Sequence, residues 1–123
     1  MTRLQGALLV SAGGVLGALA RAMVVTVLPH PGATWDWATL VVNTVGAALL
    51  VALLSRRPAD RVRLLLGTGM LGGFTTFSAL TVAVVLLLDA GRFVVATAYV
   101  AASVLTLLAG GLLGRRLGAL AWR

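Results

Sequence analysis

The chain has 123 residues, 60% of them hydrophobic, with a mean hydropathy of +1.06 and a formal net charge of +7. It contains no cysteine and one histidine, His30, so disulfides and clusters of metal-binding side chains are excluded. The composition is typical of a membrane protein, and without a nucleophile and base pair we do not expect an enzyme.

Four apolar stretches are long enough to cross a bilayer, which takes about 20 residues. Their approximate bounds are 4–28, 37–54, 64–88 and 93–113. Because only short turns separate them, we predict an all-α membrane protein in which residues 1–123 form a single domain of four transmembrane helices. The first stretch could alternatively be a signal peptide, but its apolar run exceeds the roughly 7 to 15 residues of a signal core.

In the first span, three small residues and an arginine share one helical face: Gly14, Gly17, Ala18 and Arg21. The small residues would let another helix approach closely. An arginine within a span costs about 2.5 to 3.5 kcal/mol on insertion scales, so it needs a partner or a path to water. Arg21 either serves a pore or extends to the membrane interface from a position near the end of the span.

The second and fourth spans carry similar polar faces. They consist of Thr39, Asn43 and Gly46 in the second span and of Tyr99, Ser103, Thr106 and Gly110 in the fourth. The amide of Asn43 offers two N–H donors and an acceptor oxygen, and it could hold two helices together or supply a donor to a pore. The hydroxyls of the fourth span could line the same pore or bond back to their own helix.

The third span contains the stretch GTGMLGGFTTFSAL at 67–80. Its glycines weaken the helix, and Thr75, Thr76 and Ser78 offer the freed backbone groups other partners. A broken helix at membrane depth exposes carbonyls to cations and N–H groups to anions. The alternative is close packing through a GxxxG pair, Gly69 and Gly73. The hydroxyls directly after the glycines favour a broken third helix and an ion site.

The acidic residues indicate which kind of ion is handled. All three, Asp36, Asp60 and Asp89, fall in turns, so no carboxylate inside the membrane could bind a cation or carry a proton. This argues against proton-coupled cation export. The remaining polar residues are hydrogen-bond donors, and Phe77 adds a ring edge with partial positive charge. Such a lining suits a small, strongly hydrated anion.

The arginines outside the spans are distributed unequally between the two sides. Eight lie at the termini and in the turn between the second and third spans: Arg3, Arg56, Arg57, Arg61, Arg63, Arg115, Arg116 and Arg123. The opposite side has Arg92 alone. Under the positive-inside rule, both termini are therefore expected in the cytoplasm. A nucleic-acid partner is not expected, because no aromatic residues are interleaved with these arginines.

These features together resemble the Fluc (CrcB) family of bacterial fluoride channels. The motifs that carry the resemblance are GALAR at 17–21, TLVVNTVG at 39–46 and GGFTTFS at 72–78, and the similarity extends over essentially the whole chain. The resemblance implies an antiparallel dimer, surrounded by lipid in the bacterial inner membrane, with two narrow fluoride pores. It also implies a structural sodium ion, which is not transported, at the centre of the dimer interface.

We assign the fluoride pore to seven residues: Arg21, Thr39, Asn43, Phe77, Ser78, Tyr99 and Ser103. Asn43 would donate to fluoride, and Phe77 would be the first of two phenylalanines whose ring edges face the ion. Gly72 and Thr75 would bind sodium through their backbone carbonyls, and the break in the third span would turn those carbonyls inward.

Two positions depart from the family pattern. Leu80 stands where a second pore phenylalanine is usual, and Ala83 stands where many members have a glutamate. Both would fall in one pore lining. We expect a passive fluoride-selective channel that lets toxic fluoride leave the cytoplasm. The alternative is a poorly conducting subunit that completes a channel with a paralogue of opposite orientation, because so strong an arginine bias disfavours the inverted copy that a homodimer requires. A small transporter of another substrate would lack a coupling residue.

Overall fold

The structure is a computed structural model that describes residues 1–28 and 34–120. It consists of α1 (Arg3–Val27), α2 (Trp37–Ser55), α3 (Asp60–Val62), the π-helical segment η1 (Arg63–Leu71), α4 (Gly72–Phe74), α5 (Phe77–Asp89) and α6 (Phe93–Leu120). Four helical units are long and apolar enough to cross a membrane: α1, α2, α6 and the run Asp60–Asp89. The predicted all-helical protein with four spans is thereby confirmed for the described residues. His30 and Arg123 lie outside those residues.

Local sequence signals set the ends of the first two spans. At the start of α1, the Thr2 hydroxyl accepts the Gln5 N–H at 3.2 Å and the Gln5 side chain accepts the Thr2 N–H at 3.0 Å, which forms a capping box. α2 begins after Asp36, whose carboxylate accepts the Thr39 N–H at 3.0 Å. α2 is followed by Arg57 in the left-handed conformation, with φ of 46°.

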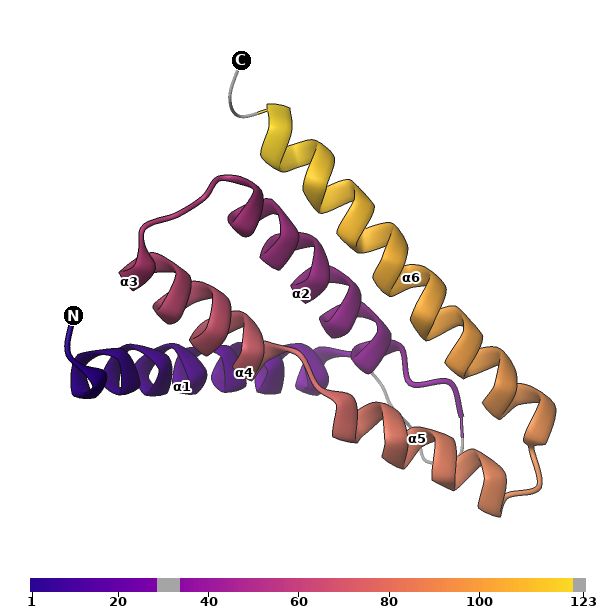
Figure 1. Cartoon of the computed structure of the whole chain (residues 1–123). Coiled ribbons are helices and arrows are strands. Elements are labelled where there is room, and N and C mark those ends of the chain that lie inside the picture. Colours follow the sequence, from indigo (N-terminus) through magenta and orange to yellow (C-terminus); the bar gives the residue numbers. More distant parts are fainter. Residues whose placement is uncertain (29–33, 121–123) are drawn as a thin grey trace.

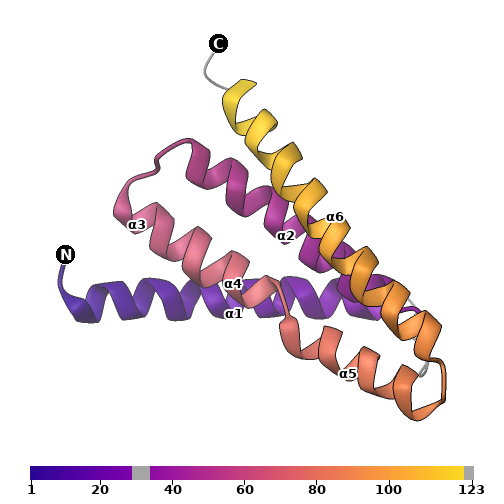
Figure 2. The ribbon, with the colours of Figure 1, turned by 45° about the vertical axis from the view of Figure 1, so that its right-hand side comes forward.

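The spans contact each other as two pairs. α2 and α6 run side by side, and α1 crosses the third span along η1 and α4 (Figures 1 and 2). Small residues allow both approaches, since a Cβ added to Gly114 of α6 would overlap the Ala48 carbonyl of α2, and one added to Gly17 of α1 would overlap the Met70 carbonyl of η1. Van der Waals contact between backbones therefore holds each pair together.

The third span shows both close packing through its glycines and a break in the helix, the two alternatives that its sequence leaves open. Gly69 and Gly73 pack against α1 so closely that an added Cβ on either would clash with the α1 backbone. The helix is then interrupted at Thr75 and Thr76, whose ψ angles are 157° and 122°. Before the interruption, η1 already has π-helical spacing, which is often found near functional sites. The glycines thus attach the third span to α1, whereas the threonines form the break.

The arginine-rich segments gather at one end of the molecule. The start of α1, the connection between α2 and α3 and the end of α6 lie toward that end, and the turn between α5 and α6 lies toward the other (Figures 1 and 2). Arg92 is in that opposite turn. The structure thus keeps the two groups of arginines apart, and the cytoplasmic location of the termini stays a prediction.

Candidate functional site: a broken helix between two grooves

The break in the third span is attached to α2 by Asn43. Its Nδ2 donates to the Thr76 carbonyl at 2.9 Å, and its Oδ1 accepts the Thr76 N–H at 2.8 Å. We call this pair of bonds the Asn43–Thr76 clamp. It replaces the partners that the Thr76 backbone would have in a continuous helix. The Thr76 hydroxyl also caps α5 by accepting the Ala79 N–H at 3.2 Å, so one residue ends the break and begins the next helix.

Arg21 reaches the same break from α1. Its Nη1 donates to the Thr75 carbonyl at 3.3 Å, in a partly buried position. The side chain thus points into the protein toward the break, and its role in a pore stays a prediction. Arg21 and Asn43, from two different spans, thus bind the carbonyl and the N–H of the peptide group between Thr75 and Thr76, and Asn43 also binds the next carbonyl.

A groove of about 410 Å³ opens on one side of the break. We call it the Asn43 groove, and it is lined by Leu40, Asn43, Thr75, Thr76, Phe77, Leu80, Ser103, Val104, Thr106, Leu107 and Leu108. It brings together Asn43, Phe77 and Ser103, three of the residues assigned to the pore from the sequence. Phe77 is 80% exposed, so its ring is available to a further molecule. The clamp uses one of the two N–H groups of Asn43, and the other is left for a ligand.

A second groove, of about 340 Å³, lies against the same break. We call it the Arg21 groove, and it is lined by Arg21, Val25, Thr39, Val42, Thr76, Ser78, Ala79 and Val82. It contains three more of the assigned residues, Arg21, Thr39 and Ser78. Thr76 lines both grooves. The break therefore divides the assigned residues into two sets, with Thr76 between them.

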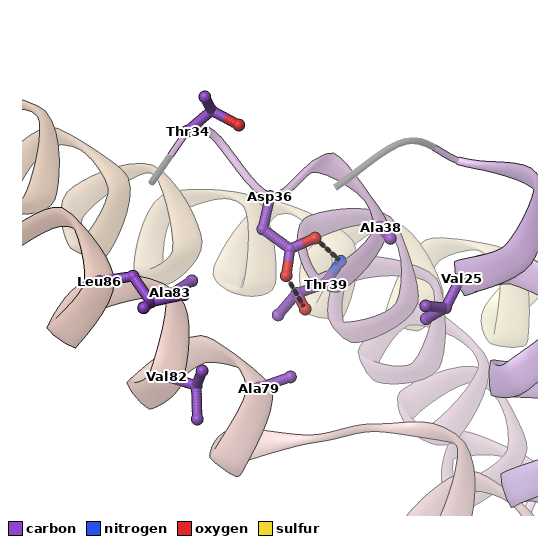
Figure 3. Close-up of a pocket in the computed structure, with 9 residues that line it drawn as sticks. All are labelled: Val25, Thr34, Asp36, Ala38, Thr39, Ala79, Val82, Ala83 and Leu86. Atoms are coloured by element: carbon purple, nitrogen blue, oxygen red, sulfur yellow. Dashed lines mark hydrogen bonds between the residues drawn. The ribbon is translucent and has the colours of Figure 1, made fainter. Parts of the chain in front are cut away.

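Next to the Arg21 groove, Asp36 binds Thr39 (Figure 3). The carboxylate accepts the Thr39 N–H at 3.0 Å and the Thr39 hydroxyl at 2.6 Å, inside a cavity of about 220 Å³. Thr39 is 3% exposed. Its hydroxyl proton is thus committed to the helix cap. Thr39 contributes the shape of the groove and an oxygen acceptor, whereas Asn43 and Arg21 contribute donors.

The hydroxyl residues of α6 behave differently from one another. Ser103 and Thr106 donate to carbonyls of their own helix, at 2.8 and 3.3 Å, as one of the two sequence alternatives states. Tyr99 lines neither groove and is fully buried. Its ring packs edge-on against Trp35, with centroids 5.3 Å apart, and its hydroxyl donates to the Asp36 carbonyl at 3.1 Å. Tyr99 thus ties α6 to the start of α2.

The two departures from the family pattern, Leu80 and Ala83, share one apolar cluster, but of the two only Leu80 lines a groove at the break, so the expectation that both fall in one pore lining is not met. Leu80 lines the Asn43 groove together with Phe77. Ala83 is 6% exposed and belongs to the apolar cluster around Tyr99. A longer acidic side chain at position 83 would enter that cluster or the cavity of Figure 3. Leu80 is therefore the departure that changes the Asn43 groove itself.

The proposed sodium ligands, Gly72 and Thr75, lie just before and within the break. Within residues 1–28 and 34–120, no three His, Asp or Glu side chains are grouped so that they could hold a metal ion. Gly72 is exposed, and a Cβ added there would meet only the Gly67 carbonyl, at 4.0 Å. The Thr75 carbonyl already accepts from Arg21, and a carbonyl oxygen has two lone pairs. The Thr75 carbonyl thus keeps one lone pair for a cation, and the sodium site stays a prediction.

Sequence reasoning did not assign Thr76 to the site, although it holds the central position. A signal was present, because threonine directly before a helix is a preferred N-cap. Its pairing with Asn43 had no local signal, since the two residues are 33 positions apart.

Known proteins with similar sequences were compared with the chain. Residues 8–115 match the family described as CrcB-like protein, Camphor Resistance (CrcB). The chain is 40% identical over 128 aligned positions to the fluoride-specific ion channel FluC of Caulobacter sp. (strain K31), an alignment that covers 95% of this chain and 98% of that protein. It is 44% identical over 111 positions to FluC of Rhodospirillum centenum, covering 85% and 87%. A shorter alignment with FluC 2 of Thermobifida fusca, 53% identical over 75 positions, covers 57% of this chain and 56% of the relative. With its broken third span and the motifs that surround it, the chain belongs to the CrcB family.

Proposed function

We propose that the chain is the subunit of a passive, fluoride-selective channel of the bacterial inner membrane, through which fluoride leaves the cytoplasm. The observation that carries the proposal is the Asn43 groove, where a free amide N–H and the exposed Phe77 ring meet beside a broken helix. Fluoride holds its water strongly, so a selective pore has to replace that water with hydrogen-bond donors. No acidic residue lines this groove. The names of the relatives, fluoride-specific ion channels, support the same ion.

The two grooves are proposed as successive parts of one path. The guanidinium of Arg21 attracts an anion into the Arg21 groove by its charge. The anion then passes Thr76, which lines both grooves, and reaches the free N–H of Asn43 and the ring edge of Phe77. Arg21 also keeps the Thr75 carbonyl engaged, so that this oxygen repels an anion less than a free carbonyl would.

A second, antiparallel subunit is proposed to cover the break. Broken backbone at membrane depth occurs where protein or a water-filled cavity covers it, rather than lipid. Gly72, Phe77 and Ser78 are exposed in the single chain, so the cover has to come from another molecule. In such a dimer, the Gly72 and Thr75 carbonyls of both subunits would hold the structural sodium ion. A bound cation would offset the negative carbonyl ends that the break leaves.

A second candidate function is favoured by the arginine distribution. All arginines of the described termini and of the 56–63 connection lie toward one end of the molecule, which disfavours insertion of inverted copies (Figures 1 and 2). The chain would then pair with a paralogue of opposite orientation and conduct poorly alone. Some relatives carry the numbers 1 and 2 in their names, in keeping with organisms that have more than one such protein.

Fluoride efflux from liposomes that contain this chain alone tests the proposal. We expect fluoride to leave within the assay and chloride, the control anion, to stay. Efflux that appears only after a paralogue is added would show the partner-subunit function, and no efflux in either case would refute a channel. A reporter fused to the C-terminus decides orientation: signals on both sides of the membrane indicate a homodimer, and a purely cytoplasmic signal indicates pairing with a paralogue.

A further inference from the structure

An apolar groove opens at the arginine-rich end of the molecule, between α2 and η1. It has a volume of about 310 Å³. We call it the Arg56 groove, and it is lined by Leu49, Ala52, Leu53, Arg56, Leu66, Met70 and Leu71. Leu49 is 52% exposed, so the groove is open to the surroundings of the chain. One charged side chain and an otherwise apolar lining make it unlike the two grooves at the break.

The lining residues of α2 place the charge at one end of the groove. Leu49, Leu53 and Arg56 are spaced by four and three residues, so they lie along one face of the helix. From Arg56 to Leu49 the helix rises about 10 Å, at about 1.5 Å per residue. Because α2 ends at the arginine-rich end of the molecule, the apolar part of the groove extends from there toward the middle of the span (Figure 1).

The charge at the head of the groove is not neutralised within the described chain. The ion pair of this connection joins Arg63 to Asp60 at 3.0 Å, and no acidic group within the described ranges pairs with Arg56. The next residue, Arg57, is exposed and has φ of 46°. Glycine is the residue favoured in this left-handed position after a helix. A second arginine therefore follows Arg56 directly, in a backbone conformation that glycine usually takes.

We propose that the Arg56 groove binds an anionic phospholipid, with the phosphate at Arg56 and one acyl chain along Leu49, Leu53 and Met70. Charge complementarity selects the headgroup, because a zwitterionic lipid brings its own cation to a groove that already holds the guanidinium of Arg56, with Arg57 next to it in the chain. The apolar lining selects a chain-bearing molecule over a free phosphate. The proposal does not depend on fluoride conduction, since it uses residues away from both grooves at the break.

Native mass spectrometry of the full chain in neutral detergent tests this proposal. Phosphatidylglycerol and phosphatidylcholine with identical acyl chains are added separately, and the bound fraction is measured. Both lipids carry the phosphate, so the difference comes from the choline cation of phosphatidylcholine, which the arginine repels. We expect the anionic lipid to bind about tenfold more tightly. Arg56→Gln should remove most of this difference. Arg116→Gln is the matched control, because Arg116 has the same charge and lies at the same end of the molecule but does not line the groove. The affinity of this variant for phosphatidylglycerol should remain within about twofold of that of the original chain.

Leu49→Trp provides a second test, because it fills the groove without changing any charge. It should weaken phosphatidylglycerol binding about as much as Arg56→Gln does. Equal weakening by Arg116→Gln would show diffuse attraction and overturn the proposal, and so would equal binding of the two lipids by the unmodified chain. Displacement by glycerol phosphate at the same concentration as the lipid would show that the acyl chain is not held. If Leu49→Trp keeps its lipid but loses its dimer, the groove is a protein interface instead.

Discussion

Replacing Asn43 by alanine is expected to loosen the broken segment and to remove a donor to fluoride at the same time. The change deletes both bonds of the Asn43–Thr76 clamp, at 2.9 and 2.8 Å. The N–H and the carbonyl of Thr76 would then lack partners at membrane depth, where water is scarce. The variant therefore tests structure and conduction together.

The expected magnitude follows from the two groups that lose their partners. An unsatisfied buried polar group costs about 1 to 3 kcal/mol, so two such groups would cost about 2 to 6 kcal/mol. Asn43 is half-buried and the Asn43 groove admits water-sized molecules, so we expect the lower end, about 2 kcal/mol of unfolding free energy. Loss of a hydrogen bond to a charged ligand removes about 1.5 to 3 kcal/mol from fluoride binding, which is at least about tenfold in affinity. We expect flux to fall with the affinity, because the ion loses a replacement for its water.

Two measurements on the same protein separate these effects. Denaturant unfolding in detergent gives the stability, and fluoride efflux from liposomes gives the flux. Thr106→Ala is the matched control, because Thr106 lines the same groove but its hydroxyl bonds to Ser103 of its own helix. We expect it to change stability by about 0.5 kcal/mol or less. Asn43→Asp keeps the acceptor for the Thr76 N–H but places a carboxylate oxygen against the Thr76 carbonyl, so it should lower both stability and flux.

The reasoning would be refuted in two separable ways. If Asn43→Ala and Thr106→Ala unfold with the same free energy, the clamp contributes nothing to the fold. If Asn43→Ala conducts fluoride as fast as the original chain, Asn43 is not part of the conduction path. A channel that is destabilised but conducts normally would leave Asn43 with a structural role alone.

The other predictions concern the helix contacts and the cation site. Gly17→Ala should destabilise the chain by about 1 to 3 kcal/mol in thermal unfolding, because its Cβ would overlap the Met70 carbonyl, whereas Gly14→Ala, with open space around the Cβ, should be nearly neutral. The leucine side chain of Gly72→Leu has room within its own chain, so the variant should keep its helix content. Cross-linking should show a weaker dimer, and an intact dimer would place Gly72 outside the interface. Thr75→Ser keeps the backbone carbonyl and should be harmless. In the original chain, dimer stability should fall when sodium is replaced by a large organic cation. Equal dimer stability with the two cations would contradict carbonyl ligation of sodium.

The four spans, the start of α2 and the existence of the polar faces could be read from the sequence because they depend on neighbouring residues. The length of an apolar stretch predicts a span, and the spacing of residues such as Asn43 and Gly46 predicts a shared helical face. The Asp36 cap belongs to the same class, since its bond partner Thr39 is three positions away. Such signals do not require knowledge of which helices touch.

The partner that each polar side chain binds could be identified only from the folded chain. Arg21 and Thr75 are 54 positions apart, and Asn43 and Thr76 are 33 apart, so their contacts depend on how α1 and α2 cross the third span. Alternatives that the sequence left open, such as Asn43 as a link between helices or as a donor, proved compatible, because one amide has enough groups for the clamp and for a ligand.

Tyr99 and Ser103 show the same limit within one helix. They are four residues apart and share a face of α6, yet Tyr99 is buried against Trp35 while Ser103 lines the Asn43 groove. Helical spacing specifies the direction of a side chain, but the neighbour that it meets depends on where α2 and α5 lie along that face. A local pattern can therefore predict which residues point inward, and the crossing of the helices settles whether they meet a core or a groove.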